Sequence, residues 1–190
     1  GDPPGPNTDR GLLFLGELSS LRMLSVSGRG ITDGGLHHLS KLEHLELLGL
    51  FETSVTGNGL RELKCLEQLR VVDLRRSPVN DEGLRQIAGL PALRELWLTS
   101  NGNDDLPSEL IDISSNGLAY LAQSKTLKRL GLQNMKLGDD AVDGLLALRE
   151  LHLESLILKD VLPESAVRRV CEGLGLVPDR FDTWKFVRPK

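Results

Sequence analysis

Histidine is the residue type in this chain that most readily suggests a metal site. Three of the four histidines lie close together, at positions 37, 38 and 44. Metal ligands on one face of a helix need a spacing of three or four residues, whereas His37 and His38 diverge by about 100° around a helix. We therefore expect these histidines to lie on a solvated surface, and we expect no metal site.

The two cysteines, Cys65 and Cys171, are far apart and lie in unlike sequence contexts. This predicts free thiols in a reducing compartment, and hence a cytoplasmic protein. Cys65 lies between Leu63 and Leu66, where a small buried apolar residue is expected. The sequence contains no Gly-x-Ser-x-Gly, no His-Glu-x-x-His and no phosphate-binding loop. We therefore expect neither an enzyme nor a bound cofactor.

The composition is dominated by leucine. The chain has 190 residues, of which 41 are leucine and seven are aromatic, and its net charge is −4. The length predicts one domain with a sizeable core, and the apolar content excludes a disordered chain. No apolar stretch approaches the ~20 residues that cross a bilayer. The interspersed charges and negative balance argue against nucleic acid as a partner.

Six segments of the chain share the pattern Leu-x-x-Leu-x-Leu, with valine in two places. Their first residues are spaced by 24, 24, 24, 34 and 21 positions. A fixed period of this size is typical of a repeat architecture. The six units, by their three apolar positions, are 21/24/26, 45/48/50, 69/72/74, 93/96/98, 127/130/132 and 148/151/153.

The spacing of apolar residues in each repeat predicts a strand, a turn and a helix. The alternation within each unit is that of a strand with one buried face, whereas Leu36, Leu39 and Leu42 recur every three residues, as in a helix. Short polar residues precede the helical runs, where they can accept hydrogen bonds from free helix N–H groups. No repeat can bury its leucines alone. We therefore predict an α/β solenoid with parallel strands on the concave face and helices on the convex face. The polar residues are Thr32–Asp33, Thr56, Asn80–Asp81 and Asp139–Asp140.

The units resemble leucine-rich repeats. The segments ITDGGL at positions 31–36 and VNDEGL at positions 79–84 are similar to those of ribonuclease-inhibitor-like and F-box/leucine-rich-repeat proteins. The resemblance covers about residues 7–162. It implies a horseshoe-shaped protein-binding module, and as a specific role the substrate-recognition domain of a ubiquitin ligase. A scaffold in a larger complex and the recognition domain of a bacterial effector are the alternatives. Leucine or valine stands where the F-box group often has cysteine at the second strand position.

Both ends of the chain depart from the regular repeat. Residues 7–12 superimpose on residues 31–36 at an offset of 24, so we read 1–20 as a leader and half repeat before six repeats over 21–162. This predicts either a piece of a longer protein or a first repeat capped by the Pro-rich leader. Residues 163–190 predict a capping helix that ends at Gly175, followed by a tail whose Phe181, Trp184 and Phe186 close the core.

The variable strand positions on the concave face are where we expect a protein partner to bind. Apolar residues at these positions on neighbouring strands form an exposed patch, which on a soluble protein usually marks a contact surface. Trp97 is the expected anchor, with arginines beside it. We expect the chain to be a monomer in isolation. The predicted partner-binding residues are Met23, Leu47, Phe51, Val71, Arg75, Trp97, Arg129 and His152.

The fourth repeat carries about ten extra residues between Thr99 and Asp112. Insertions in repeats map to loops on one face, often the binding face. Asn103, Asp104 and Asp105 of this insertion suggest a calcium site, but the EF-hand spacing with its central glycine and twelfth-position glutamate is missing. The loop is predicted either to be merely solvated or to contact the partner.

Overall fold

The computed structural model describes residues 7–100, 113–135, 137–138, 140–179 and 184–189. These residues form one eight-stranded sheet whose first six strands are parallel and follow one another in chain order. Two short antiparallel strands continue the sheet beyond β6 in the order β8, β7. The strands are β1 Met23–Ser27, β2 Leu47–Phe51, β3 Val71–Asp73, β4 Glu95–Thr99, β5 Arg129–Gln133, β6 Ser155–Lys159, β7 Val177–Pro178 and β8 Lys185–Val187.

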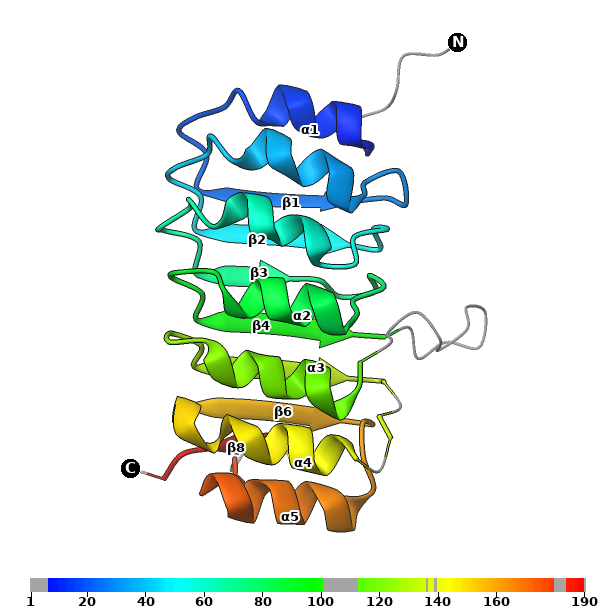
Figure 1. Ribbon diagram of the computed structural model, residues 1–190, viewed down its shortest axis with the longest axis vertical. Coiled ribbons are helices and arrows are strands. Elements are labelled where there is room, and N and C mark those ends of the chain that lie inside the picture. The colour runs from blue at the N-terminus through cyan, green and yellow to red at the C-terminus, as the bar shows by residue number, and fades with distance from the viewer. Residues whose placement is uncertain (1–6, 101–112, 136, 139, 180–183, 190) are drawn as a thin grey trace.

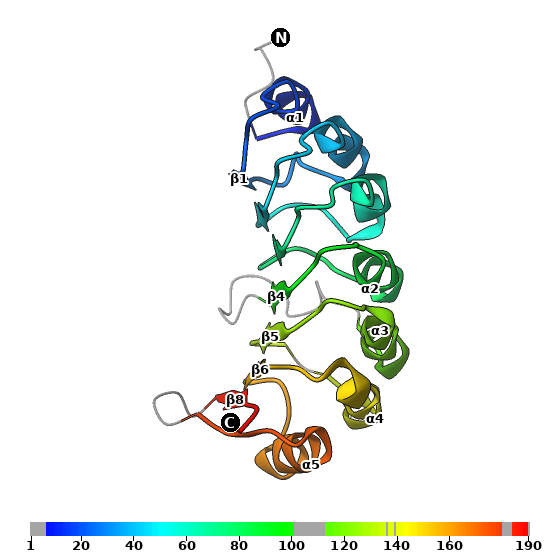
Figure 2. The same cartoon turned by 90° about the vertical axis from the view of Figure 1, so that its left-hand side faces the viewer.

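The helices stack in a second layer on one side of the sheet (Figure 1). Viewed along the layers, the strands line the concave side of a gently curved solenoid and the helices its convex side (Figure 2). The helical segments are α1 Asp9–Leu15, η1 Asp33–Leu39, η2 Asn58–Leu63, α2 Asp81–Ala88, α3 Ser115–Tyr120, η4 Leu121–Gln123, α4 Ala141–Leu146, η5 Ala147–Leu151 and α5 Glu164–Leu174.

The predicted fold class, an α/β leucine-rich-repeat solenoid, is confirmed. Leu48, Leu50 and Leu74 are completely buried between the layers, as are Leu36, Leu39 and Leu42 from the helical side. The three-residue spacing of Leu36 and Leu39 has a specific cause, because η1 is a 3₁₀ helix, and Leu42 lies in the turn that follows it. A 3₁₀ helix has three residues per turn, so side chains three positions apart share one face.

The sixth strand lies later in the chain than the sequence pattern predicts. The interpretation of Leu148, Leu151 and Leu153 as the sixth unit is wrong, because residues 147–151 form η5 and the strand is Ser155–Lys159. Leu156 and Leu158 pair in register with Leu130 and Leu132 of β5 and are completely buried. Leu148 and Leu151 instead continue the buried face of α4 at helical spacing.

A glycine at the same position of five successive repeats lets the helices pack closely; we call this set the glycine row. A Cβ atom built on Gly83 would lie 2.0 Å from the carbonyl oxygen of Thr56, and one on Gly59 2.4 Å from that of Asp33. Real Cβ atoms essentially never approach another heavy atom within 3.0 Å. Each helix therefore rests its first turn directly on the backbone or capping carboxylate of the preceding repeat. The glycine row is Gly35, Gly59, Gly83, Gly117 and Gly144.

An aspartate at the start of a helix links its repeat to the next one. The Asp33 carboxylate accepts hydrogen bonds from the Thr56 N–H at 3.0 Å, the Thr56 hydroxyl at 2.6 Å and the Gly59 N–H at 2.8 Å. Asp9 accepts in the same way from Thr32, and Asp81 from Ser114. Among the predicted capping residues, Thr32 and Asn80 cap their own helices, whereas Asp33 and Asp81 act across repeats. Asp140 makes no side-chain capping hydrogen bond to α4, and Asp139 lies outside the described residues.

Asp33→Ala is expected to lower the free energy of unfolding by about 2 kcal/mol. It removes a charged acceptor and leaves two backbone N–H groups and one hydroxyl without that partner, and hydrogen bonds to charged groups contribute about 1.5–3 kcal/mol. Urea denaturation measures the change. Asp143→Ala is the matched control, since Asp143 also lies in a first helical turn but is exposed and has no side-chain hydrogen bond within the described residues. Equal stability of the two variants would contradict the linking role.

The C-terminal end of the solenoid is covered by α5 and the short antiparallel strands. Helix α5 begins after Pro163 and ends at Gly175, which adopts the left-handed conformation with φ of 66°. Phe186 on β8 is buried opposite Leu156 of β6, whereas Trp184 remains 42% exposed. Phe181 lies outside the described residues. Of the three tail aromatic residues that we expected to close the core, Phe186 is therefore the described one that is buried there.

Candidate functional site

The concave face is built from three rows of side chains that cross the parallel strands. The register places Met23, Leu47 and Val71 side by side at the strand starts, followed by Glu95 and Arg129. Met23 is 68% exposed, and Leu47 and Val71 are half-buried. The strand starts therefore carry an apolar half on β1–β3 and a charged half on β4 and β5.

Two aromatic rings fill spaces left by glycines in the central row of this face. The Trp97 ring on β4 lies across Gly131 of β5, where an added Cβ would be 2.3 Å from Trp97 Cε3. The Phe51 ring folds over Gly49 of its own strand, where an added Cβ would be 2.7 Å from Phe51 Cε2. Both rings are half-buried. Each glycine thus sets the position of one aromatic side chain on the surface.

Asp73 is a member of this site that sequence reasoning did not single out. It lies in the central row between Gly49 and Trp97, and it is only 8% exposed. Its carboxylate oxygens lie 2.9 Å from Nε of Arg75 and 2.7 Å from Nη2. This pair holds the Arg75 guanidinium 5.1 Å from the centroid of the Phe51 ring, within the range of a cation–π contact.

The two predicted arginines carry charges that the protein itself compensates. Arg75 pairs with Asp73, and Arg129 lies 2.7 Å from Glu95 on the neighbouring strand. A second carboxylate, that of Glu154, lies 4.0 Å from Arg129. The guanidinium groups that we expect beside Trp97 are therefore held in place by internal ion pairs.

His152 does not lie on the concave row where the sequence predicted it. It ends η5 in the left-handed conformation with φ of 51°, and its Nδ1 lies 2.9 Å from the Glu150 carbonyl oxygen. The cause is the later position of β6, which places Ser155 and Ile157 beside Arg129 and Gly131. Asn103, Asp104 and Asp105 of the insertion lie outside the described residues.

Comparison with known proteins supports the fold. No family model and no curated protein matches the sequence, including models for the two resembled families. The chain is similar to the C-terminal domain of tropomodulin from Caenorhabditis elegans, with 14% identity and a TM-score of 0.51 over 87% of this chain and 90% of that one. An internalin from Listeria monocytogenes is 16% identical, with a TM-score of 0.32 over 83% of this chain and 61% of that one. A plant peptide hormone receptor is 14% identical, with a TM-score of 0.32 over 84% and 36%. At 14% identity, the likeness to the tropomodulin domain concerns the fold alone.

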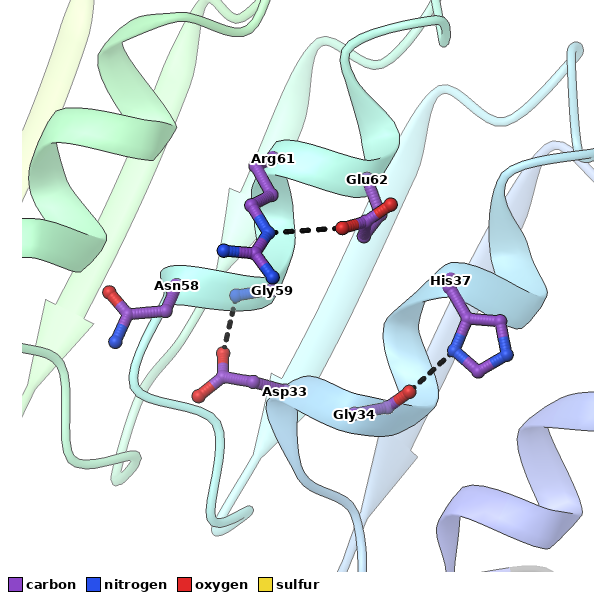
Figure 3. Close-up of a pocket in the computed structure, with 7 residues that line it drawn as sticks. All are labelled: Asp33, Gly34, His37, Asn58, Gly59, Arg61 and Glu62. Atoms are coloured by element: carbon purple, nitrogen blue, oxygen red, sulfur yellow. Dashed lines mark hydrogen bonds and ion pairs between the residues drawn. The ribbon is translucent and has the colours of Figure 1, made fainter.

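A shallow polar pocket lies on the opposite, helical side, between η1 and η2 (Figure 3). Asp33, His37 and Glu62 are among its lining residues. The Asp33 carboxylate is occupied by its links to the next repeat, Glu62 pairs with Arg61, and His37 Nδ1 lies 2.6 Å from the Gly34 carbonyl oxygen. These three side chains are therefore engaged within the protein, whereas the buried Oδ1 of Asn58 in the same pocket accepts no hydrogen bond from the described residues.

The rings of His37 and His38 lie together, contrary to the divergence that helical spacing predicts. Their centroids are 3.8 Å apart, with the ring planes tilted by 45°. Across the part of the chain that the structure describes, no three His, Cys, Asp or Glu side chains are grouped so that they could hold a metal ion. The described helices include none that is both long and apolar enough to span a membrane.

The two thiols occupy opposite environments. Cys65 is exposed, so the expectation that it is buried is wrong; its Sγ lies 3.4 Å from the carbonyl oxygen of Ser40. Cys171 is buried beside an apolar cavity between α5 and the β7–β8 strands. Burial, together with the nearby charge of Glu172, raises the pKa of the Cys171 thiol to about 11. The cavity is lined by Leu162, Val167, Cys171, Leu176, Trp184 and Phe186, among others.

Thiol labelling at pH 8 is expected to modify Cys65 rapidly and Cys171 only after unfolding. The thiolate is the reactive form, and a pKa of about 11 leaves about one Cys171 thiol in a thousand ionised at this pH. Absorbance with an aromatic disulfide reagent counts the reactive thiols in buffer and in denaturant. The Cys65→Ser variant isolates Cys171. Rapid labelling of this folded variant would contradict the assignment.

Proposed function

We propose that this chain is a protein-binding module that holds its partner on the concave face of the sheet. The contact surface is the set Met23, Leu47, Phe51, Val71 and Trp97, which we call the concave patch. The single observation that carries the proposal is that these five apolar side chains, exposed or half-buried, occupy neighbouring strands. Contiguous apolar surface on a soluble protein is costly to leave in water and usually marks an interaction site.

The chemistry of this face favours recognition over catalysis. Its charged side chains are engaged in pairs, Asp73 with Arg75 and Glu95 with Arg129. Such pairs fix the rim of a contact surface and leave the apolar side chains as the groups that gain most from burial. Aromatic residues and arginine are the types that most often dominate interface energies, which favours Trp97 as the anchor.

As the specific role, we propose substrate recognition within a ubiquitin ligase complex. The support is the resemblance of residues 31–36 and 79–84 to F-box/leucine-rich-repeat proteins. The two free thiols fit a reducing compartment, and we therefore place the module in the cytoplasm. The fold by itself does not select this role, because the same scaffold carries many partners.

Affinity capture from cells, followed by mass spectrometry, tests both levels of the proposal. The chain is compared with Trp97→Ala and with the matched control Phe14→Ala, which removes an aromatic residue that is 66% exposed on α1, outside the concave patch. We expect a partner that the Trp97→Ala variant loses and the control retains. Equal capture of the partner by all three proteins would show that the partner does not bind at Trp97 on the concave face. Recovery of no ligase subunit would remove the ligase role and leave the binding module.

A further inference from the structure

A row of three basic residues borders the concave patch at the strand starts. Arg70 immediately precedes β3, Arg94 immediately precedes β4 and Lys128 immediately precedes β5. The Arg94 N–H donates to the Arg70 carbonyl at 2.8 Å, and the Lys128 N–H to the Arg94 carbonyl at 2.9 Å. The three residues are therefore adjacent rungs of one row, about 4.8 Å apart. We call them the basic row.

The charges of the basic row have no ionic partner within the described residues. Arg70 and Arg94 are exposed and Lys128 is half-buried, and none of the three belongs to any of the ion pairs found there. The acidic residues that lie on either side of the basic row form ion pairs with other cations. Glu46 pairs with Arg22, and Glu154 lies 4.0 Å from Arg129.

This arrangement stands out against the rest of the molecule. The chain has a net charge of −4, and its other strand-face arginines, such as Arg75 and Arg129, are paired. Three adjacent uncompensated cations repel one another and gain from an anionic ligand. Arg70 and Arg94 also offer guanidinium groups that can bind carboxylates in a bidentate manner.

We propose that the basic row binds a short acidic segment of the protein partner, in which several Asp or Glu residues follow closely in sequence. This inference rests on the proposed function, because Val71 and Glu95 place the row directly beside the concave patch. An extended peptide advances about 3.3 Å per residue, so a run of acidic residues crossing the strands presents carboxylates to all three rungs. The partner's apolar residues then lie over Trp97 and its neighbours.

A protein segment fits this row better than a nucleic acid does. Among the described residues, only three uncompensated cations lie in line, and the acidic residues Glu46 and Glu154 flank them at the two ends. A nucleic-acid site needs a broad cluster of cations to neutralise successive phosphates. A short acidic peptide needs no more contacts than the row supplies.

Fluorescence anisotropy with labelled decaglutamate tests the proposal on the intact chain. The variant Arg70→Gln/Arg94→Gln/Lys128→Gln is compared with Arg61→Gln/Arg85→Gln/Arg168→Gln, which removes the same charge from the helical side. We expect the first variant to weaken binding by about tenfold or more and the second by less than about twofold, since each exposed charge pair contributes about 1.4- to fivefold to binding. Thermal unfolding checks that both variants are folded.

The outcomes separate this proposal from the proposed function. Decaglutamate has no apolar side chain, so Trp97→Ala is expected to leave its binding unchanged while it weakens capture of the partner. Equal losses of decaglutamate affinity in the two triple variants, or no binding of decaglutamate at about 20 mM salt, would contradict the binding role of the basic row. Neither result would affect the proposed role of the concave patch. Tighter binding of oligothymidylate, lost in the same variant, would overturn the peptide assignment in favour of nucleic acid.

Discussion

Gly83→Ala is expected to lower the free energy of unfolding by about 2 kcal/mol, although alanine is the better helix former. The added Cβ would lie 2.0 Å from the Thr56 carbonyl oxygen and 3.0 Å from the Gly57 Cα. Both are backbone atoms, so η2 and α2 must separate to accommodate the methyl group. Overpacking of this kind costs about 1–3 kcal/mol, which exceeds the roughly 1 kcal/mol that alanine gains over glycine within a helix.

Gly34→Ala is the matched control for this prediction. Gly34 lies in the first turn of η1 beside Gly35 of the glycine row, but an added Cβ there would meet only Thr32 Oγ1 at 3.4 Å and Asp9 Oδ2 at 3.7 Å. These are ordinary contact distances, so we expect unchanged or slightly raised stability. Urea denaturation of both variants gives the comparison. If Gly83→Ala proved as stable as Gly34→Ala, the close packing of α2 on η2 would be disproved.

In a solenoid, the Gly83→Ala change acts on the coupling between neighbouring repeats. Each repeat contacts only its neighbours, so overall cooperativity depends on every interface along the stack. A weakened contact between η2 and α2 is expected to broaden the unfolding transition, because the two halves of the chain then unfold less as one unit. Asp33→Ala weakens the preceding junction by removing hydrogen bonds instead.

The sequence was sufficient to predict the fold because one pattern recurs. Alternating leucines specify a strand with one buried face, and every additional unit in the same register reinforces the assignment. The sixth unit shows where this reasoning fails. Leu148 and Leu151 are spaced by three, which suits both the first two positions of the motif and one face of a helix. Only the pairing of β6 with β5 distinguishes the two interpretations.

The concave face was predictable as a set of positions, but its geometry was not. The repeat register is enough to bring Trp97 and Val71 onto neighbouring strands. It says nothing of rings that lie over glycines, because that depends on side-chain torsions and on the space between strands. Likewise, the internal ion pairs that compensate Arg75 and Arg129 depend on which acidic side chains reach them. The glycine row did have a sequence signal, namely glycine recurring just before the first buried helical leucine.

Trp97→Ala is expected to weaken partner binding by about 2 kcal/mol or more, which corresponds to about thirtyfold in Kd. The side chain occupies the middle of the central row and is half-buried in the free protein, so part of its ring is still available for burial by a partner. Burying a large apolar side chain contributes about 1.5–3 kcal/mol. Isothermal titration with the captured partner measures the change.

Trp97→Ala should lower the free energy of unfolding of the free protein much less than truncation of a core leucine does. The Trp97 ring packs on Gly131 at the surface, whereas Leu96 and Leu98 of the same strand are completely buried. Truncation of a buried leucine costs about 2–5 kcal/mol. We therefore expect Trp97→Ala to lower the free energy of unfolding by about 1 kcal/mol, because it removes only surface packing. Unchanged affinity, or a variant that fails to fold, would show that Trp97 serves the structure of the sheet and not the partner.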